Sequence, residues 1–248
     1  MEDFFIINNE CSLDHGVVVK ELPSITIPKK RVEEVTVLGR DGTLTVSDET
    51  YEPTTKTCKV YYNGENPDEL IAFLQDGKVI FSNFPDRFYN MQIVSEIPID
   101  EIFKNNEYGD WYEFPINFRC QPFGYSIDNE EVIITQKDTS IYNYASKESE
   151  PIITVFGDGD INLLINEQQV ILKGVEGYIT IDSTKLRSYK DLENQNSKKI
   201  GNFPVLKVGE NNINWDGNIT KIVITPNYRW IVWLHYFKQM KLFFLMME

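Results

Sequence analysis

The chain has 248 residues, and 38 acidic against 24 basic side chains give it a formal net charge of -14. Apolar residues make up 42% of it, which is typical of globular proteins and excludes extended disorder and fibrous repeats. Because an acidic surface repels phosphate, this charge argues against a nucleic-acid-binding protein. The length is sufficient for two ordinary domains, each with its own core.

The cysteines and the N-terminus bear on the compartment in which the chain is made. Cys11, Cys58 and Cys120 are odd in number and contain no CxxC pair, which fits neither a disulfide framework nor a zinc site. Synthesis in a reducing cytoplasm is the simplest account. The N-terminal segment MEDFFIINNE is acidic where a signal peptide is basic, so we expect no signal peptide.

The first region, residues 1–130, is dominated by short runs that alternate with period two, the pattern of β-strands. The expected strands are Val17–Val19, Ser24–Pro28, Arg31–Val37, Thr43–Val46, Thr57–Tyr62, Lys78–Phe81, Tyr89–Val94 and Trp111–Arg119. A turn at Arg40–Thr43 should join two of them into a projecting hairpin. We expect this hairpin to be an arm that reaches a neighbouring subunit. The candidate arm residues are Arg40, Asp41, Gly42, Thr43 and Leu44.

One helix is expected between Asn66 and Gly77. Asn66 suits the N-cap, Pro67 the first helical position and Gly77 the C-cap. Its apolar stripe consists of Leu70, Ile71, Phe73 and Leu74. This stripe should pack on one face of the sheet, which makes residues 1–130 a β-rich domain with one short helix.

The segment from Gln121 to Glu150 is polar at both ends, with a β run at Val132–Thr135, and within it residues 131–150 are expected to connect two domains. In residues 151–230, short alternating runs are interrupted by Gly, Asn and Pro, which predicts a small antiparallel β-sandwich. Its expected strands include Ile152–Phe156, Ile161–Ile165, Val170–Leu172, Tyr178–Ile181 and Ile219–Thr225. The glycine-rich segments 157–160 and 217–218 are expected to be turns.

The last segment, residues 231–248, is apolar but is broken by Lys238, Gln239 and Lys241. It is marginal in length and purity for a membrane span, and none is expected. A segment this apolar tends to find a surface, so we expect a loosely packed tail or a partner-binding helix.

Four short elements of the second half occur in a fixed order. They are the strand Pro151–Phe156 followed by a glycine turn, the strand Gly177–Asp182, the segment Gly201–Pro204 and the turn Gly209–Asn211. Their order and spacing resemble the C-terminal half of the siphophage distal tail protein family, Dit, in its short form without carbohydrate-binding insertions. The first half resembles the same family through its short helix and its hairpin.

The resemblance implies a virion structural protein rather than an enzyme. It implies a hexameric ring formed by the N-terminal domains, with a galectin-like β-sandwich outside the ring. Such a ring joins the tail tube to the tail-tip and receptor-binding proteins and leaves a channel for DNA, so the expected location is the virion tail tip. In that channel we expect Asp and Glu to outnumber Lys and Arg.

Catalytic motifs find little support in the sequence. His15 and His235 are the only histidines, and no G-x-S-x-G, H-E-x-x-H, Walker or dinucleotide motif occurs. Asp158 and Asp160 could offer oxygens to calcium, but a glycine turn explains their spacing more simply. We therefore expect no cofactor and no metal.

An alternative function is a carbohydrate-binding module that attaches a particle to cell-wall sugars. Trp215 is the candidate sugar contact, because it lies beside a Gly-Asn turn in the predicted galectin-like domain. A cell-wall hydrolase is a weaker alternative, since a glycosidase pair of carboxylates is defined by spatial separation and not by sequence.

Overall fold

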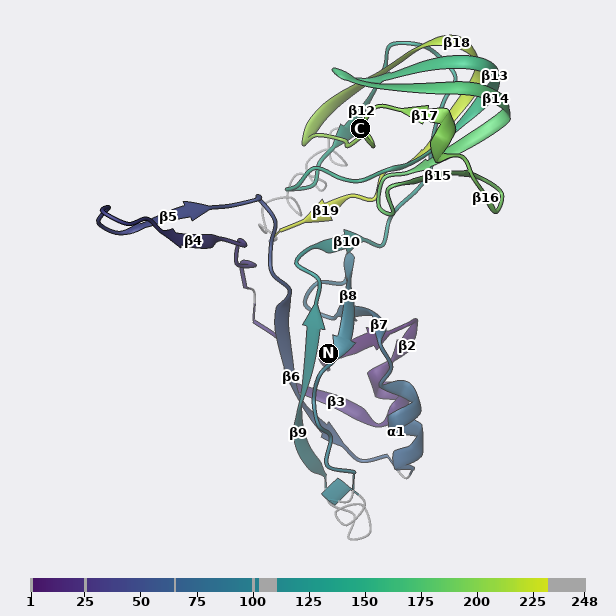
Figure 1. The fold of residues 1–248 in the computed structure, drawn as a ribbon. Coiled ribbons are helices and arrows are strands. Elements are labelled where there is room, and N and C mark those ends of the chain that lie inside the picture. The colour runs from purple at the N-terminus through teal and green to yellow at the C-terminus, as the bar shows by residue number, and fades with distance from the viewer. Residues whose placement is uncertain (1, 25, 65, 100, 103–110, 232–248) are drawn as a thin grey trace, which may run out of the picture. The chain divides into compact units, whose positions relative to one another are not determined.

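The computed structural model describes residues 2–24, 26–64, 66–99, 101–102 and 111–231. The chain divides into two compact units, Met1–Gly124 and Tyr125–Trp230, each with its own hydrophobic core. Strands dominate both units (Figure 1), which confirms the prediction of a mainly β protein with a short helix.

The first unit is built on an antiparallel sheet with the strand order β2-β1-β7-β8-β9-β6-β3. These strands are β1 (Phe5–Ile7), β2 (Glu10–Cys11), β3 (Val17–Glu21), β6 (Thr54–Tyr62), β7 (Gly77–Phe81), β8 (Arg87–Ile93) and β9 (Tyr112–Cys120). A separate two-stranded sheet pairs β4 (Glu33–Thr36) with β5 (Thr43–Val46). The expected strand at Ser24–Pro28 is not formed by its described residues, which are bounded by prolines that lack an N–H donor.

The helix α1 spans Pro67–Phe73 and begins where the sequence predicted. Asn66 caps it, because its Oδ1 accepts a hydrogen bond of 3.1 Å from the backbone N–H two residues further on. Leu70 and Phe73 are buried in the core of the first unit, as expected. Ile71 was assigned to the same stripe, but it faces solvent.

Gly77 does not cap α1 as predicted, because the helix has already ended and Gly77 begins β7. The glycine is needed for a different reason. The Asn8 side chain lies against it, donating from Nδ2 to the Asp76 carbonyl at 3.2 Å and accepting on Oδ1 from the Lys78 N–H at 3.0 Å. A Cβ on Gly77 would lie 2.1 Å from that Oδ1, so only glycine leaves room for this bridge.

Aromatic rings fill the core of the first unit. Phe5 meets Phe118 edge to face at 5.4 Å and stacks on Phe73 of the helix at 5.9 Å. Phe81 meets Phe118 at 5.6 Å, again edge to face. Such ring pairs are favourable beyond the area that they bury. They attach α1 to strands β1, β7 and β9.

Two of the three free cysteines lie in the same core. Cys58 and Cys120 are buried, and burial raises the pKa of each thiol to about 12. Cys11 is only partly buried. The two core thiols are therefore almost wholly protonated at neutral pH, and a protonated thiol is a poor nucleophile.

We expect one thiol of the folded protein to react rapidly with iodoacetamide at pH 7.5, and peptide mass spectrometry should place the label on Cys11. The other two thiols lack thiolate character and access. Protein unfolded in guanidinium chloride is the control, and all three thiols should react in it. Equally fast labelling of Cys58 or Cys120 in the folded protein would contradict their place in the core.

The second unit is an antiparallel sheet with the strand order β11-β18-β13-β14-β15-β16. Its strands are β11 (Val132–Ile134), β12 (Thr139–Asn143), β13 (Ile152–Ile165), β14 (Gln168–Asp182), β15 (Arg187–Lys190), β16 (Glu193–Asn194), β17 (Lys199–Ile200) and β18 (Gly209–Thr225). β12 also pairs with β18, and β17 pairs with β14. The short strands β10 (Gly124–Ser126) and β19 (Arg229–Trp230) precede and follow them in the chain.

Residues 131–150, which we expected to connect two domains, contain β11 and β12. Both strands pair with β18, so this segment contributes to the sheet of the second unit. The polar composition of residues 131–150 did not indicate strands of a folded unit, because a strand with one solvent-facing side needs few apolar residues.

Three strands of the second unit are unusually long: β13, β14 and β18 have 14, 15 and 17 residues. The sequence predicted shorter strands separated by glycine turns. Instead, each strand continues through its glycines, and the pairing register shifts there as it does at a β-bulge. The segment 157–160 is therefore a kink within β13 and not a turn.

Glycine is required at this kink because neighbouring strands approach closely. A Cβ on Gly157 would lie 2.1 Å from the carbonyl oxygen of Asn218 on β18. A Cβ on Gly217 would lie 2.6 Å from the carbonyl oxygen of Asp160 on β13. Both contacts are with backbone, which cannot move aside without disturbing the sheet.

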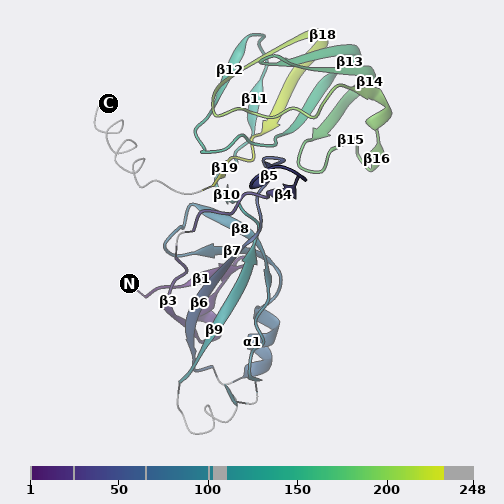
Figure 2. The same ribbon diagram turned by 60° about the vertical axis from the view of Figure 1, so that its left-hand side comes forward.

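The kink also keeps one face of each long strand directed at the core. On β18, Ile213 and Trp215 are buried before it, whereas Ile222 and Ile224 are buried after it. The buried positions thus change from odd to even numbers, which an inserted bulge residue allows. Both groups belong to one hydrophobic cluster, and the long strands curl around it (Figures 1 and 2).

Gly157→Ala should destabilise the second unit by about 2 kcal/mol or more, because the added methyl must displace a backbone carbonyl. Gly174→Ala is the control from the same sheet: its φ is positive, at 53°, so the substitution carries a backbone cost, but a Cβ there meets nothing within 4 Å. That substitution should cost about 1 kcal/mol.

Hydrogen exchange of β13 and β18 peptides at increasing urea concentration measures the stability of this unit separately from the first. Equal losses of stability in the two variants would contradict the steric role of Gly157.

Candidate assembly interface

The hairpin formed by β4 and β5 carries the predicted arm residues. Its strands pair as far as Thr43, and a tight turn closes the tip at Val37–Arg40. In this turn the Arg40 N–H donates to the Val37 carbonyl at 3.2 Å, and Gly39 has a φ of 81°. A positive φ at the third position is typical of a type II turn. The turn thus lies before the predicted Arg40–Thr43, and Thr43 belongs to β5.

Backbone hydrogen bonds continue the hairpin below its two strands. The Arg31 N–H donates to the Thr50 carbonyl at 2.9 Å, and an ion pair of 2.6 Å joins Lys30 to Glu49. This ion pair is solvent-exposed, so it contributes little to stability. The backbone pairing is what defines the path of the hairpin.

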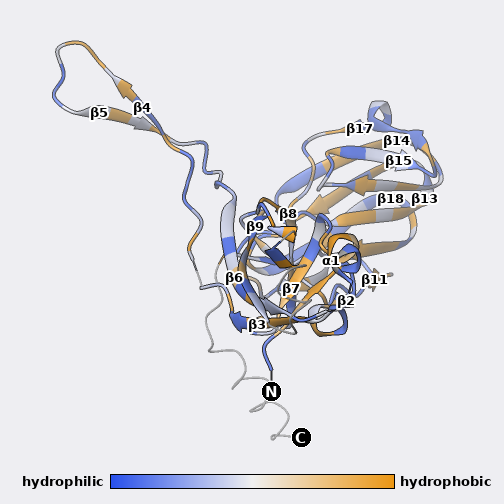
Figure 3. Ribbon diagram, turned by 90° about the horizontal axis from the view of Figure 1, so that it is seen from below, coloured by the Kyte–Doolittle hydropathy of each residue, from blue (hydrophilic) through white to orange (hydrophobic). Residues whose placement is uncertain are grey.

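One face of the hairpin carries three apolar side chains, with Glu33 opposite the last of them. Val35 lies opposite Leu44, and Val46 follows on the same face, two residues along β5. Their exposed fractions are 38%, 41% and 51%. The adjacent pair, Thr36 opposite Thr43, lies on the other face and is polar. Figure 3 shows the apolar residues of β4 and β5 in orange.

A hairpin of this kind is only marginally stable when both of its faces are exposed to water. All residues of β4 and β5 are exposed, so neither face is covered by a sheet or helix of the described residues. An isolated two-stranded hairpin is marginally stable at best. An exposed apolar strip usually marks a surface that another protein covers. Among the described residues, this hairpin is the strongest candidate for an assembly interface.

Trp215, the predicted sugar contact, lies in the core of the second unit and is 5% exposed. Its ring therefore has no open face on which a sugar could stack. Its spacing of two residues from Ile213 on the same strand explains the inward direction, because alternate residues share a face. This candidate contact is wrong.

Of the two histidines, His15 lies within the described residues. His15 ends the short 3-10 helix η1 (Ser12–His15), and its Nε2 lies 2.9 Å from a carboxylate oxygen of Glu10. Its ring stacks on Phe73 at a centroid distance of 4.3 Å. These contacts give His15 a packing role against α1. His235 lies outside the described residues.

The aspartates of the kink have backbone partners. Asp158 accepts a hydrogen bond of 2.9 Å from the Gly177 N–H. Asp160 accepts one of 3.0 Å from the Gly174 N–H and lies 2.7 Å from the ammonium of Lys173. The Lys173 contact and then the Gly174 N–H lower the pKa of the Asp160 carboxyl. These carboxylates therefore serve the bulged backbone.

The described residues offer neither a metal site nor a membrane-spanning helix. No group of three or more His, Cys, Asp and Glu side chains is arranged to hold a metal ion there. None of the helices in the described ranges is long and apolar enough to cross a membrane.

Asp160→Asn should flatten the acid dependence of the melting temperature. The pKa of Asp160 is lowered in the folded state, so its stabilising contribution is present above the unfolded pKa and is lost as pH falls through the folded pKa. Calorimetry between pH 7 and 2 should show a steeper fall for the unmodified protein below about pH 4.

Adding Lys173→Met to the Asp160→Asn variant is the control, and it should not change the slope further because the ion pair is already absent. Identical slopes for the unmodified protein and Asp160→Asn would refute the assignment.

The described residues thus define a class of mainly β proteins built of two units. A solved structure of this class has a similar fold, with a TM-score of 0.67 over 92% of this chain and 99% of that chain. It is described as the crystal structure of SPP1 Dit (gp 19.1), a paradigm of hub adsorption apparatus in phages that infect Gram-positive hosts. The two sequences are 15% identical.

The resemblance to the Dit family that the sequence predicted is thus confirmed at the level of the fold. No family model matches the chain, and no curated protein is significantly similar to it in sequence.

Proposed function

We propose that this protein is the structural hub of a siphophage tail tip. The observation that carries the proposal is the similarity of its fold to SPP1 Dit across almost the whole of both chains. The four ordered sequence elements of the second half support it independently, because they rest on the sequence and not on the fold.

In this proposal the protein forms a hexameric ring through its first unit. The ring joins the tail tube to the tail-tip and receptor-binding proteins at the end of the virion tail. It leaves a channel for DNA, and the net charge of -14 suits a lining that does not retain phosphate. Its role is structural, without catalysis or a cofactor.

The hairpin is the proposed arm between neighbouring subunits. In a closed ring each subunit uses one surface to contact the next and a different surface to receive the previous one. A hairpin whose apolar face is uncovered within its own subunit fits the first of these surfaces. The arm includes the predicted residues Arg40, Asp41, Gly42, Thr43 and Leu44, of which Leu44 lies on the apolar face.

Replacing the apolar pair Val35 and Leu44 by Asp should weaken assembly at least tenfold, because charges would be buried at the contact. The matched control replaces Thr36 and Thr43 by Asp. It places two opposed charges on the same hairpin but on its polar face, so assembly should be nearly unchanged.

Light scattering coupled to size-exclusion chromatography over a range of concentrations measures the effect, and negative-stain imaging tests six-fold symmetry. A monomer at all concentrations would contradict a self-assembling ring. Equal effects of the two double variants would contradict the hairpin as its contact.

A further inference from the structure

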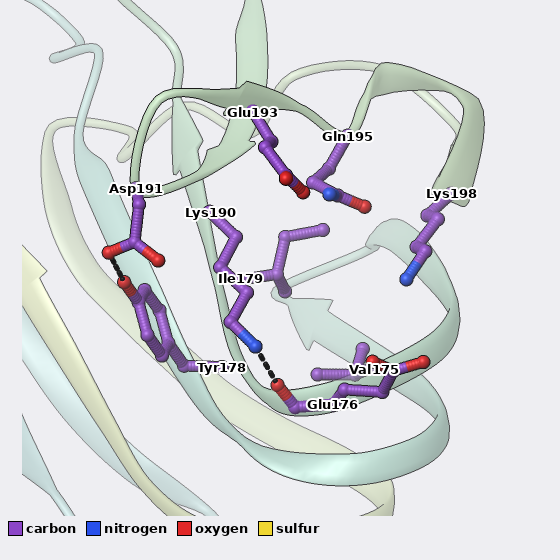
Figure 4. A pocket seen from close by; sticks show the side chains of 9 residues that line it. All are labelled: Val175, Glu176, Tyr178, Ile179, Lys190, Asp191, Glu193, Gln195 and Lys198. Carbon is purple, nitrogen blue, oxygen red and sulfur yellow. Dashed lines mark hydrogen bonds between the residues drawn. The ribbon is translucent and has the colours of Figure 1, made fainter.

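A pocket of about 290 Å³ opens on the second unit beside β14, β15 and β16, lined by residues between positions 175 and 198 (Figure 4). Its polar groups already have partners within the chain. The Lys190 ammonium donates to the Glu176 carbonyl at 2.6 Å, and the Tyr178 hydroxyl donates to Asp191 at 2.5 Å. A cation without such a partner lies instead in the first unit.

This cation is Lys56, a lysine in the core of the first unit. It lies on β6 and is 7% exposed. It shares a face of the strand with Cys58 and Val60, which are fully buried, because alternate residues point to the same side. Across the sheet it pairs with Phe118 of β9, another core residue. Lysine is almost never buried in this way unless its charge is paired.

Lys56 has no counter-charge. The exposed lysine on the same strand, Lys59, lies 2.6 Å from a carboxylate oxygen of Glu21. Within the part of the chain that the structure describes, no carboxylate is that close to Lys56, whose ammonium instead lies over the Tyr89 ring at 4.6 Å from its centre. Burial lowers the pKa of this ammonium. A contact with an aromatic face offsets only part of the cost of burying a charge.

Tyr89, on β8, supplies a second hydrogen-bond donor at the same place. Burial raises the pKa of its hydroxyl, which therefore keeps its proton at neutral pH. The contacts of Tyr89 with described residues are with its ring, and none is a hydrogen bond to the hydroxyl. The neighbouring cation, Arg87, is already neutralised, because it donates to Asp86 at 3.0 and 2.9 Å.

The tips of both donors are open to solvent. In the described ranges, the side-chain polar atoms that are sealed from solvent and lack a hydrogen-bond partner are the hydroxyls of Ser149 and Ser188. The Lys56 ammonium and the Tyr89 hydroxyl also lack such a partner, so they are not sealed. A ligand can therefore reach them while the rest of each side chain stays buried.

A carboxylate matches this pair of donors. Its two oxygens can accept from the ammonium and from the hydroxyl, and its single charge neutralises the one uncompensated cation. A phosphate with two charges would need a second free cation, and the net charge of -14 repels it more strongly. We propose that Lys56 and Tyr89 form a binding site for a carboxylate group.

The site goes beyond the hub function, which assigns no role to the core of the first unit. The carboxylate has two possible sources with the same chemistry: a small molecule, or an acidic side chain of a neighbouring subunit. In both cases the bound group supplies the counter-charge that the chain itself does not provide.

Thermal unfolding of the full-length protein in sodium acetate tests the site, with sodium chloride at the same ionic strength as reference. Acetate should raise the temperature at which the first unit unfolds, because it binds a site that exists only in the folded state. Hydrogen exchange of β6 and β8 peptides follows this unit separately. Lys56→Met should abolish the acetate effect. Tyr89→Phe removes only the hydroxyl and should weaken acetate binding about tenfold.

Lys59→Met is the matched control on the same strand. It removes an exposed ammonium that is already paired with Glu21, so the response to acetate should be unchanged. In chloride, Lys56→Met should melt no lower than the unmodified protein, because methionine fills a similar volume without burying a charge. A lower melting temperature would show that Lys56 is held for its contact with Tyr89 and would contradict the proposal.

Light scattering on the same samples distinguishes the two sources. If a neighbouring subunit supplies the carboxylate, Lys56→Met should weaken assembly at least tenfold, and acetate should compete with assembly. If a small molecule supplies it, assembly should not change. Equal acetate responses of Lys56→Met and Lys59→Met, together with unchanged assembly, would overturn the site. Rings observed in those samples would leave the hub function intact.

Discussion

The close approach of backbone at the kink of β13 and β18 is the constraint on which the second unit depends. Gly157 and Gly217 each lie against a carbonyl oxygen of the opposite strand, in a space that no side chain could share. This contact lets strands of 14 to 17 residues bend without being broken into separate strands. Because both halves of each strand then face one core, a single network of strands can enclose it. The pocket beside β14 rests on that core.

The first unit follows a different principle, in which aromatic packing organises everything except the hairpin. Phe5, Phe73 and Phe118 join the helix to the sheet through direct ring contacts. The hairpin of β4 and β5 has no such contacts, and its apolar face is open to solvent. The two parts of this unit therefore differ: one is stabilised by its own packing, and the other leaves its apolar side chains exposed.

Local signals in the sequence were reliable where a short segment decides its own conformation. Asn66 caps α1 because its side chain reaches a backbone N–H only two residues away. The order of four elements in the second half was enough to suggest a family whose fold the structure shares. The structural roles of glycines were predicted less well from the sequence. A glycine serves a turn, a bulge or a close backbone contact equally, so the sequence predicted a helix cap at Gly77 and a turn at Gly157 that the structure does not contain.

By itself, the sequence determined that the protein is mainly β and where its helix begins. It also determined that the segment ending at Val46 forms a hairpin. These features depend on neighbours a few residues apart. Only the tertiary structure decided that Trp215 is buried, that the long strands continue through their glycines, and that residues 175 to 198 surround a pocket. Each of these depends on which strands pair and in what register, and that pairing joins residues far apart in the chain, such as Val132 on β11 and Ile224 on β18.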